Sequence, residues 1–115
     1  MKRILVLDFD GVIHRYGQGD RGNEIYDVPT PGALEFVRAA LKKFDIYILS
    51  SRAASESGRV NIANWLKKYE FPGLPCSNQK PDGEIVAFID DRAIPFRGEF
   101  PSVKSLASFH PWWEK

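Results

Sequence analysis

Residues 2–12, Lys-Arg-Ile-Leu-Val-Leu-Asp-Phe-Asp-Gly-Val, decide the fold of this 115-residue chain. The apolar run 4–7 predicts a strand that is buried on both faces, as in a parallel sheet. The strand leads into Asp8 and Asp10, and Gly11 then lets the backbone turn sharply away. Two carboxylates at the end of a buried strand are costly unless a positive charge joins them. Because ligands bind at the carboxyl ends of strands in open α/β sheets, this stretch predicts a site for a divalent cation and an anionic substrate.

The rest of the chain alternates helices with strands. A loop rich in Gly, Asp, Asn and Arg is expected over 11–29, and a helix is expected to begin at Thr30-Pro31, with Thr30 as the N-cap. The apolar patterns predict strands at 45–49, 74–77 and 85–89, a second helix over 55–69 and a tail over 93–115. This order predicts right-handed parallel crossovers and an α/β fold, a three-layer α/β/α sandwich around a parallel, Rossmann-like sheet.

Composition limits the class of protein. The length fits one domain over residues 1–115, and a net charge of +1 argues against a strongly basic nucleic-acid-binding surface, leaving only a local patch open. Cys76 is the single cysteine, so no internal disulfide forms, which fits a reducing, cytoplasmic setting. No apolar run approaches the length of a membrane span, so no membrane partner is expected.

Polar or acidic residues follow three of the expected strands. The first strand ends in Asp8 and Asp10, the second in Ser50, and the last in Asp90 and Asp91. The carboxyl ends of parallel strands lie along one edge of a sheet, so these side chains should meet there. Lys80 precedes the last strand closely enough to reach the same edge.

This set resembles the four motifs of the haloacid dehalogenase-like hydrolase superfamily, over essentially the whole chain. Asp-x-Asp-Gly-Val at 8–12 is similar to the first motif, Ile-Leu-Ser at 48–50 to the second, Lys80 to the third, and the apolar strand ending in Asp90-Asp91 to the fourth. The resemblance implies a phosphatase that works with Mg²⁺. Dehalogenases of the family usually lack the second aspartate of the first motif, so Asp10 favours phosphoryl transfer.

The resemblance also implies roles for the residues. Asp8 would be the nucleophile that forms an aspartyl-phosphate, and Asp10 the general acid and then base. Mg²⁺ would be held by Asp8, the Asp10 backbone carbonyl and an acid of the Asp90/Asp91 pair. The phosphate would be bound by a further set of side chains at the same edge of the sheet: Ser50, Ser51, Arg52 and Lys80. For three of these positions a plainer interpretation stays open: Ser50 as a strand-end cap, Lys80 as a surface lysine, and Arg52 in a surface ion pair with Glu56.

The substrate is less well defined by the sequence. Ser-x-Arg at 50–52 and Asp-Asp-Arg at 90–92 resemble the phosphatase half of polynucleotide kinase-phosphatases, but small bacterial and phage hydrolases with an Asp-Asp-Arg-Ala-Ile signature share both features. Arg92 could equally form a surface ion pair with Asp91. The segments 11–44 and 53–79 leave no room for a cap domain, so the site should be open. An open site suits a phosphate on a nucleic-acid end or a protein, or a site covered by a neighbour in a homo-oligomer.

Two other functions stay open: a non-catalytic metal- or phosphate-binding module, and a phosphotransferase with an acceptor other than water. His14 and His110 lack metal-ligand spacing and are expected in a loop and in the tail, and Cys76 is expected to be a small core residue. Trp112 and Trp113 are expected to pack on the domain or on a partner rather than to stack on bases.

Overall fold

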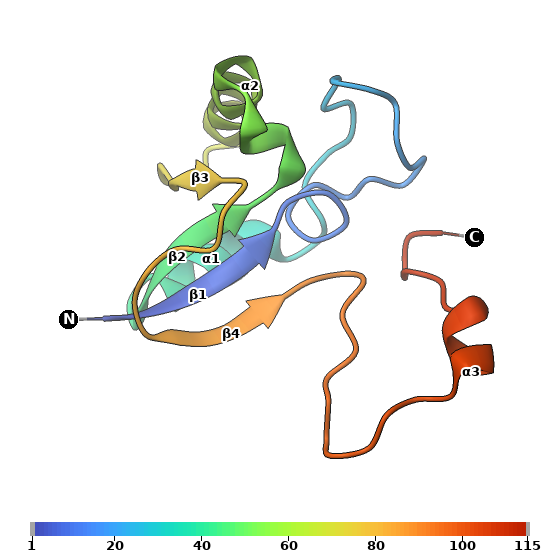
Figure 1. Ribbon diagram of the computed structural model, residues 1–115. Helices are drawn as coiled ribbons and strands as arrows, with labels where there is room; N and C mark the ends of the chain where they lie inside the picture. The colour runs from blue at the N-terminus through green and yellow to red at the C-terminus, as the bar shows by residue number, and fades with distance from the viewer. Residues whose placement is uncertain (1, 115) are drawn as a thin grey trace.

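The computed structural model describes residues 2–114 and shows a four-stranded parallel sheet (Figure 1). The strands are β1 (Arg3–Asp8), β2 (Phe44–Leu49), β3 (Cys76–Ser77) and β4 (Ile85–Ile89), and they lie in the order β3-β2-β1-β4. The central strand β1 is hydrogen-bonded on both of its sides, and four consecutive apolar residues of it are buried. The predicted α/β class and parallel sheet are confirmed.

Helices follow the strands as the apolar pattern predicts. They are α1 (Ala33–Ala40), the 3₁₀ turn η1 (Ser51–Ala54), α2 (Glu56–Lys68) and the short α3 (Val103–Ala107). The predicted N-cap at Thr30 is wrong, because α1 begins only at Ala33 and the buried Thr30 Oγ1 has no hydrogen-bond partner among the described residues. Helix α1 instead begins after Gly32, whose φ of 87° is left-handed and whose lack of a side chain leaves the helix start uncapped.

Both α1 and α2 pack on one face of the sheet. Residues that pair between parallel strands point to the same face, and the pairs Leu5–Ile46 and Leu7–Ile48 therefore share one. A single core cluster joins these residues to apolar side chains of both helices, namely Val37, Ala40, Ile62, Trp65 and Leu66. Right-handed crossovers that move in one direction along a sheet, from β1 to β2 to β3, place their helices on this same side.

The opposite face has no helix on it among residues 2–114. Ile4 and Val6 of β1 are buried on this face, but neither belongs to the core cluster. The loop from β3 to β4 covers part of this face, and a Cβ at Gly83 would lie 2.8 Å from Cδ1 of Ile4. Phe88 on the edge strand β4 remains 47 % exposed. The third layer of the predicted sandwich therefore stays a prediction.

The C-terminal segment leaves the sheet and returns to it. Residues 92–108 are all exposed and include α3, whereas Pro111 is buried against the domain again. The helix α3 was not predicted; it begins at Ser102, whose hydroxyl accepts a hydrogen bond from the Ser105 N–H. In Figure 1 this segment forms a wide excursion away from β4. Among the residues described, no helix has the length and apolar character that crossing a membrane would need.

Candidate metal and phosphate site

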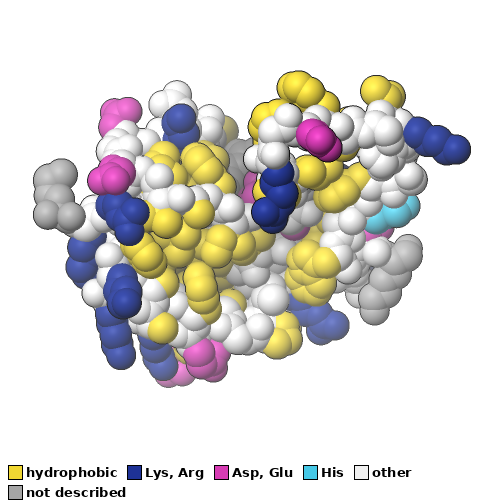
Figure 2. Space-filling view, turned by 90° about the horizontal axis from the view of Figure 1, so that it is seen from below, with side chains coloured by type: hydrophobic (Ala, Val, Ile, Leu, Met, Phe, Trp, Pro, Cys, Tyr) yellow, Lys and Arg dark blue, Asp and Glu magenta, His cyan; other side chains and the backbone are white. Residues whose placement is uncertain are grey.

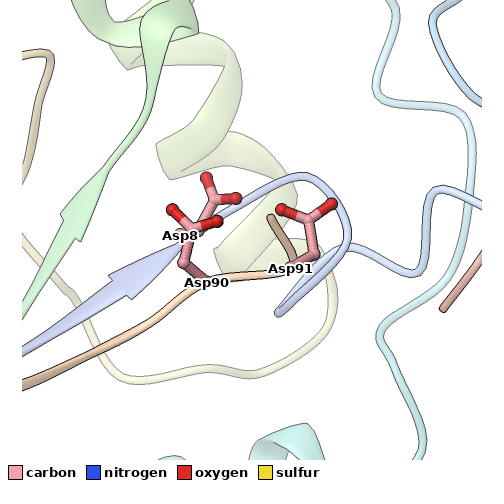
Figure 3. A group of neighbouring side chains, drawn as sticks. All are labelled: Asp8, Asp90 and Asp91. Carbon is pink, nitrogen blue, oxygen red and sulfur yellow. The ribbon is translucent and has the colours of Figure 1, made fainter. Parts of the chain in front are cut away.

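Three carboxylates meet where β1 and β4 end (Figure 3). Asp8 is the last residue of β1, and Asp90 and Asp91 follow β4 directly. Leu7 pairs with Ile89, so the next residue of each strand, Asp8 and Asp90, emerges side by side. One oxygen from each of the three carboxylates lies within 4.8 Å of the others. The sequence prediction that these acids meet at one edge is consistent with this placement.

The crowding shows in the protonation of Asp8. Burial raises the pKa of Asp8 to about 8, and a hydrogen bond with Asp91 and the charges of Asp90 and Asp91 act in the same direction. The N–H of Phe9 donates to Oδ1 of Asp8 at 2.9 Å and opposes the rise only in part. In the protein alone, Asp8 therefore keeps its proton at neutral pH. A cation among the three carboxylates would replace that proton.

Gly11 allows the tail to close one side of this group. Its φ of 85° is left-handed, and a Cβ on it would collide with Oδ2 of Asp91 and lie 2.7 Å from Nε1 of Trp113. Through this gap the indole N–H of Trp113 donates to Oδ2 of Asp91 at 2.6 Å, and that of Trp112 donates to the carbonyl of Gly11 at 2.6 Å. The prediction that the two tryptophans pack on the domain is consistent with these bonds.

Asp10 is not part of the group of three carboxylates and is held by two partners. The N–H of Asp27 donates to Nε2 of His14, so the proton of this buried imidazole lies on Nδ1, which donates to Oδ1 of Asp10 at 2.8 Å. Nε of Arg52 donates to Oδ2 at 2.8 Å. Burial alone would raise the pKa of Asp10, but the bonds from His14 and Arg52 and the Arg52 charge hold it below its usual range. Asp10 is therefore a carboxylate.

Arg52 links the site to the long loop after β1. Its side chain is only 12 % exposed, and its guanidinium donates to the carbonyls of Asn23 at 3.1 Å, Gly22 at 3.4 Å and Glu24 at 3.5 Å. The alternative interpretation, a surface pair with Glu56, is not seen among the described residues, and the guanidinium is instead occupied inside the protein. Arg52 lies on η1, and the N-cap of η1 is the buried Ser50. The Oγ of Ser50 accepts a hydrogen bond from the Arg52 N–H at 3.2 Å.

A cleft of about 310 Å³ opens beside these groups. Its lining is Asp8, Asp10, Tyr16, Asp20, Ser50, Ser51, Asp91, Arg92 and Trp113. Lys80 is exposed and is not part of this lining. Among the described residues Arg92 forms no ion pair with Asp91, and its guanidinium instead lies 5.7 Å from the Trp113 ring. Arg92 is thus the one cation of this lining, which does not include Arg52, and among the described residues its guanidinium forms no ion pair with a carboxylate.

Sequence reasoning missed four contributors to the site: His14, Tyr16, Asp20 and Trp113. His14 was expected in a loop, and it is in one, but it is fully buried with its ring 5.3–5.7 Å from three aromatic rings of the loop and α2. A usable signal was present, since Asp10 and His14 flank a tight turn and are spaced so that the two side chains meet. Nothing local in the sequence places Trp113, because it contacts Tyr16 near the other end of the chain and Asp91 beyond the exposed segment 92–108.

The donor set fits a hard divalent cation. All ligand atoms are carboxylate oxygens, which is the chemistry that Mg²⁺, Ca²⁺ and Mn²⁺ prefer, and no thiolate or imidazole faces the group in the part of the chain described. The raised pKa of Asp8 agrees with this fit, because burial and the two neighbouring acids disfavour its negative charge, and a bound cation would offset both effects. The geometry alone does not distinguish one hard cation from another.

We predict that the metal-free protein loses stability as pH rises. Between the ordinary pKa of 3.8 and about 8, folded Asp8 keeps a proton that the unfolded chain has lost, so the free energy of unfolding falls across this window. Asp8→Asn, which carries no charge, should reduce that fall, while Asp45→Asn, at an exposed position on β2, should not. Added Mg²⁺ should raise the melting temperature of wild type more near pH 8 than near pH 5. Equal pH slopes for all three proteins would contradict the interpretation.

We predict that Arg52→Lys destabilises the protein. Lysine keeps the charge but cannot bond Asp10 and three loop carbonyls together, so the free energy of unfolding should fall by about 1–3 kcal/mol. Limited proteolysis should also cut residues 17–24 faster. Arg38→Lys, at an exposed position on α1, is the matched control. An unchanged melting curve and an unchanged cleavage rate would show that Arg52 does not hold the loop.

Comparison of the chain with family models, with curated proteins and with solved structures finds no match. The case for a function therefore rests on the residues and the geometry. Its strongest element is the group formed by Asp8, Asp90 and Asp91 at the carboxyl end of a parallel sheet.

Proposed function

We propose that this chain is an Mg²⁺-dependent phosphomonoester hydrolase of the haloacid dehalogenase-like type, acting through an aspartyl-phosphate on Asp8. The observation that carries the proposal is the group of three carboxylates at the ends of β1 and β4, beside a cleft with hydroxyl groups and a free guanidinium. An anionic substrate would be repelled by so many acids without a cation. The Mg²⁺ ion supplies charge neutralisation and polarises the phosphoryl group when bound.

In the first step an oxygen of Asp8 attacks phosphorus, a P–O bond to Asp8 forms, and the bond to the leaving alcohol breaks. Asp8 must be deprotonated for this, so the loss of its proton is a condition of activity. Ser50 and Ser51 line the cleft from the end of β2 and can donate to phosphoryl oxygens, and Arg92 can pair with their charge. In the second step water attacks phosphorus, the bond to Asp8 breaks, and inorganic phosphate leaves.

Asp10 is suited to the second step as it stands. A carboxylate whose pKa is lowered by Arg52 and His14 can take the proton of the attacking water. The first step requires the other protonation state, because Asp10 would have to be protonated in order to give its proton to the leaving group. The Arg52 contact opposes that form, so leaving groups that need no proton should react best. Release of Arg52 to the phosphate would free Asp10 for the acid role.

In the part of the chain that the structure describes, a loop and the tail border this cleft. The loop after β1 brings Tyr16 and Asp20 to one side, and the tail brings Trp113 to another. A phosphate group with a short connection to a larger molecule fits such a cleft better than a whole metabolite. We therefore propose a phosphate on a macromolecule, such as a nucleic-acid end or a protein side chain, as the substrate class.

A second candidate, a metal- or phosphate-binding module without catalysis, has one observation in its favour. The expected acid and base, Asp10, is bound on both oxygens by protein groups, as a residue with a structural task would be. Transfer of the phosphoryl group to an acceptor other than water shares the first step with hydrolysis. The experiment below separates the three.

We predict Mg²⁺-dependent hydrolysis of an aryl phosphate, abolished by chelator and restored by Mg²⁺. Asp8→Asn should form no phosphoenzyme and lose activity by about 10³-fold or more, since the nucleophile is gone. Asp10→Asn should slow the first step by about 10²–10⁴-fold for phosphate esters with poor leaving groups. For aryl phosphates with good leaving groups, the first step should slow less. The variant should also let the phosphoenzyme accumulate, because the base of the second step is gone. Asp45→Asn is the control.

The readouts are phosphate release, and intact-protein mass after acid quench for the phosphoenzyme. Metal binding without turnover of any phosphoester would favour the binding module. A phosphoenzyme that reacts with alcohols but not with water would favour phosphotransfer. A covalent phosphate on any residue other than Asp8 would refute the proposed nucleophile.

A further inference from the structure

The edge strand β4 is apolar, charge-free and uncovered. It ends the sheet, so its outer edge pairs with no strand in the part of the chain described. The sequence Ile-Val-Ala-Phe-Ile carries none of the lysines, prolines or inward charges that usually protect an exposed edge. Its side chains are exposed by 38 % at Val86, 47 % at Phe88 and 38 % at Ile89, and the neighbouring Phe36 of α1 by 45 %. We call these four residues the β4 surface.

The β4 surface includes a hollow as well as an edge. An apolar cavity of about 260 Å³ lies between β4 and the start of α1, bordered by Leu7, Phe36 and Ile89. On the other side of the strand, Phe88 stands on the sheet face that no helix covers. Figure 2, viewed from the β4 side, shows hydrophobic side chains gathered over this part of the molecule. Such a patch on one chain marks a site of protein contact.

A second apolar surface extends from the end of the same strand. The segment 92–108, which we call the arm, is exposed along its whole length, yet it has a helix and several large apolar side chains. These are Ile94, Phe96, Phe100, Val103 and Leu106, with Phe100 87 % and Val103 82 % exposed. Phe96 and Phe100 contact each other, at 4.8 Å between ring centroids, while both remain open to solvent. Helix α3 buries none of its residues.

We propose that the β4 surface is the interface between two copies of this chain, and that the arm of each copy covers the β4 surface of the other. Each chain carries one uncovered apolar receiving surface and one uncovered apolar arm, and a twofold dimer uses each of them once per chain. The arm is tied at both ends, by β4 and by the Trp112 and Trp113 bonds to the site, so it can reach outward without unfolding.

The size of the two surfaces agrees with a stable dimer. From the exposed fractions above and roughly 150–250 Å² for a fully exposed large side chain, the arm and the β4 surface together present on the order of 1,000 Å² of apolar area per chain. A standard specific interface buries about 800 Å² on each partner. The arm of the second copy would thereby cover part of the sheet face that carries no helix in the described part of the single chain.

Sedimentation and light scattering of the full chain test the proposal. Wild type should have twice the 13.1 kDa mass of the chain. Phe88→Lys on the β4 surface and Phe100→Glu on the arm should each raise the dissociation constant by about tenfold or more. Val60→Lys changes an equally exposed residue (48 %) on α2 and should leave the dimer intact. Because Phe100 is 87 % exposed in the single chain, its variant should keep a folded circular dichroism spectrum.

Mixing the two single variants identifies the arm exchange. In a mixed dimer, the unaltered β4 surface of the Phe100→Glu chain receives the unaltered arm of the Phe88→Lys chain, so the mixture should recover dimer that neither variant forms alone. A monomeric wild type at all concentrations would overturn the proposal. A dimer that survives both substitutions, or one that Phe88→Lys breaks and Phe100→Glu does not, would overturn the exchange of arms.

Discussion

Mutual repulsion among Asp8, Asp90 and Asp91 is the constraint around which the rest of this structure is arranged. The parallel pairing of β1 with β4 brings these acids together, because the register that pairs Leu7 with Ile89 places the next residues, Asp8 and Asp90, side by side. Water cannot solvate all three groups fully there, so one of them keeps a proton or a cation takes its place. Gly11 and Trp113 then depend on this group, because the indole N–H reaches Asp91 only over a residue without a side chain.

A second polar connection joins the site to the fold. Asp10 receives hydrogen bonds from His14 of the loop after β1 and from Arg52 of η1, and Arg52 also binds the carbonyls of the same loop. The loop has little regular structure, so these bonds and the Trp65 N–H to the Asp27 carbonyl, at 3.0 Å, hold it in place. The residue expected to do acid–base chemistry is therefore also a structural anchor, and its low pKa follows from that task.

What the sequence could predict was local or periodic. Apolar runs located β1, β2 and β4, and helical spacing located α1 and α2 to within a few residues, because burial of one face enforces those patterns. The convergence of Asp8, Asp90 and Asp91 followed from a general property of parallel sheets. The N-cap at Thr30 was wrong because a turn over 30–33, with Gly32 in the left-handed region, comes before α1. Contacts that depend on the path of the loops, such as Trp113 with Asp91 and Arg52 with Asp10, could not be predicted, because they leave no periodic pattern in the sequence.

Anomalous diffraction from a crystal soaked in Mn²⁺, a stand-in for Mg²⁺ with the same preference for oxygen ligands, tests the central claim most directly. The account predicts one strong anomalous peak per chain, within bonding distance of carboxylate oxygens of Asp8 and of at least one of Asp90 and Asp91, and no such peak in Asp8→Asn. A peak elsewhere, or none at this group in wild type with the carboxylates still together, would contradict it.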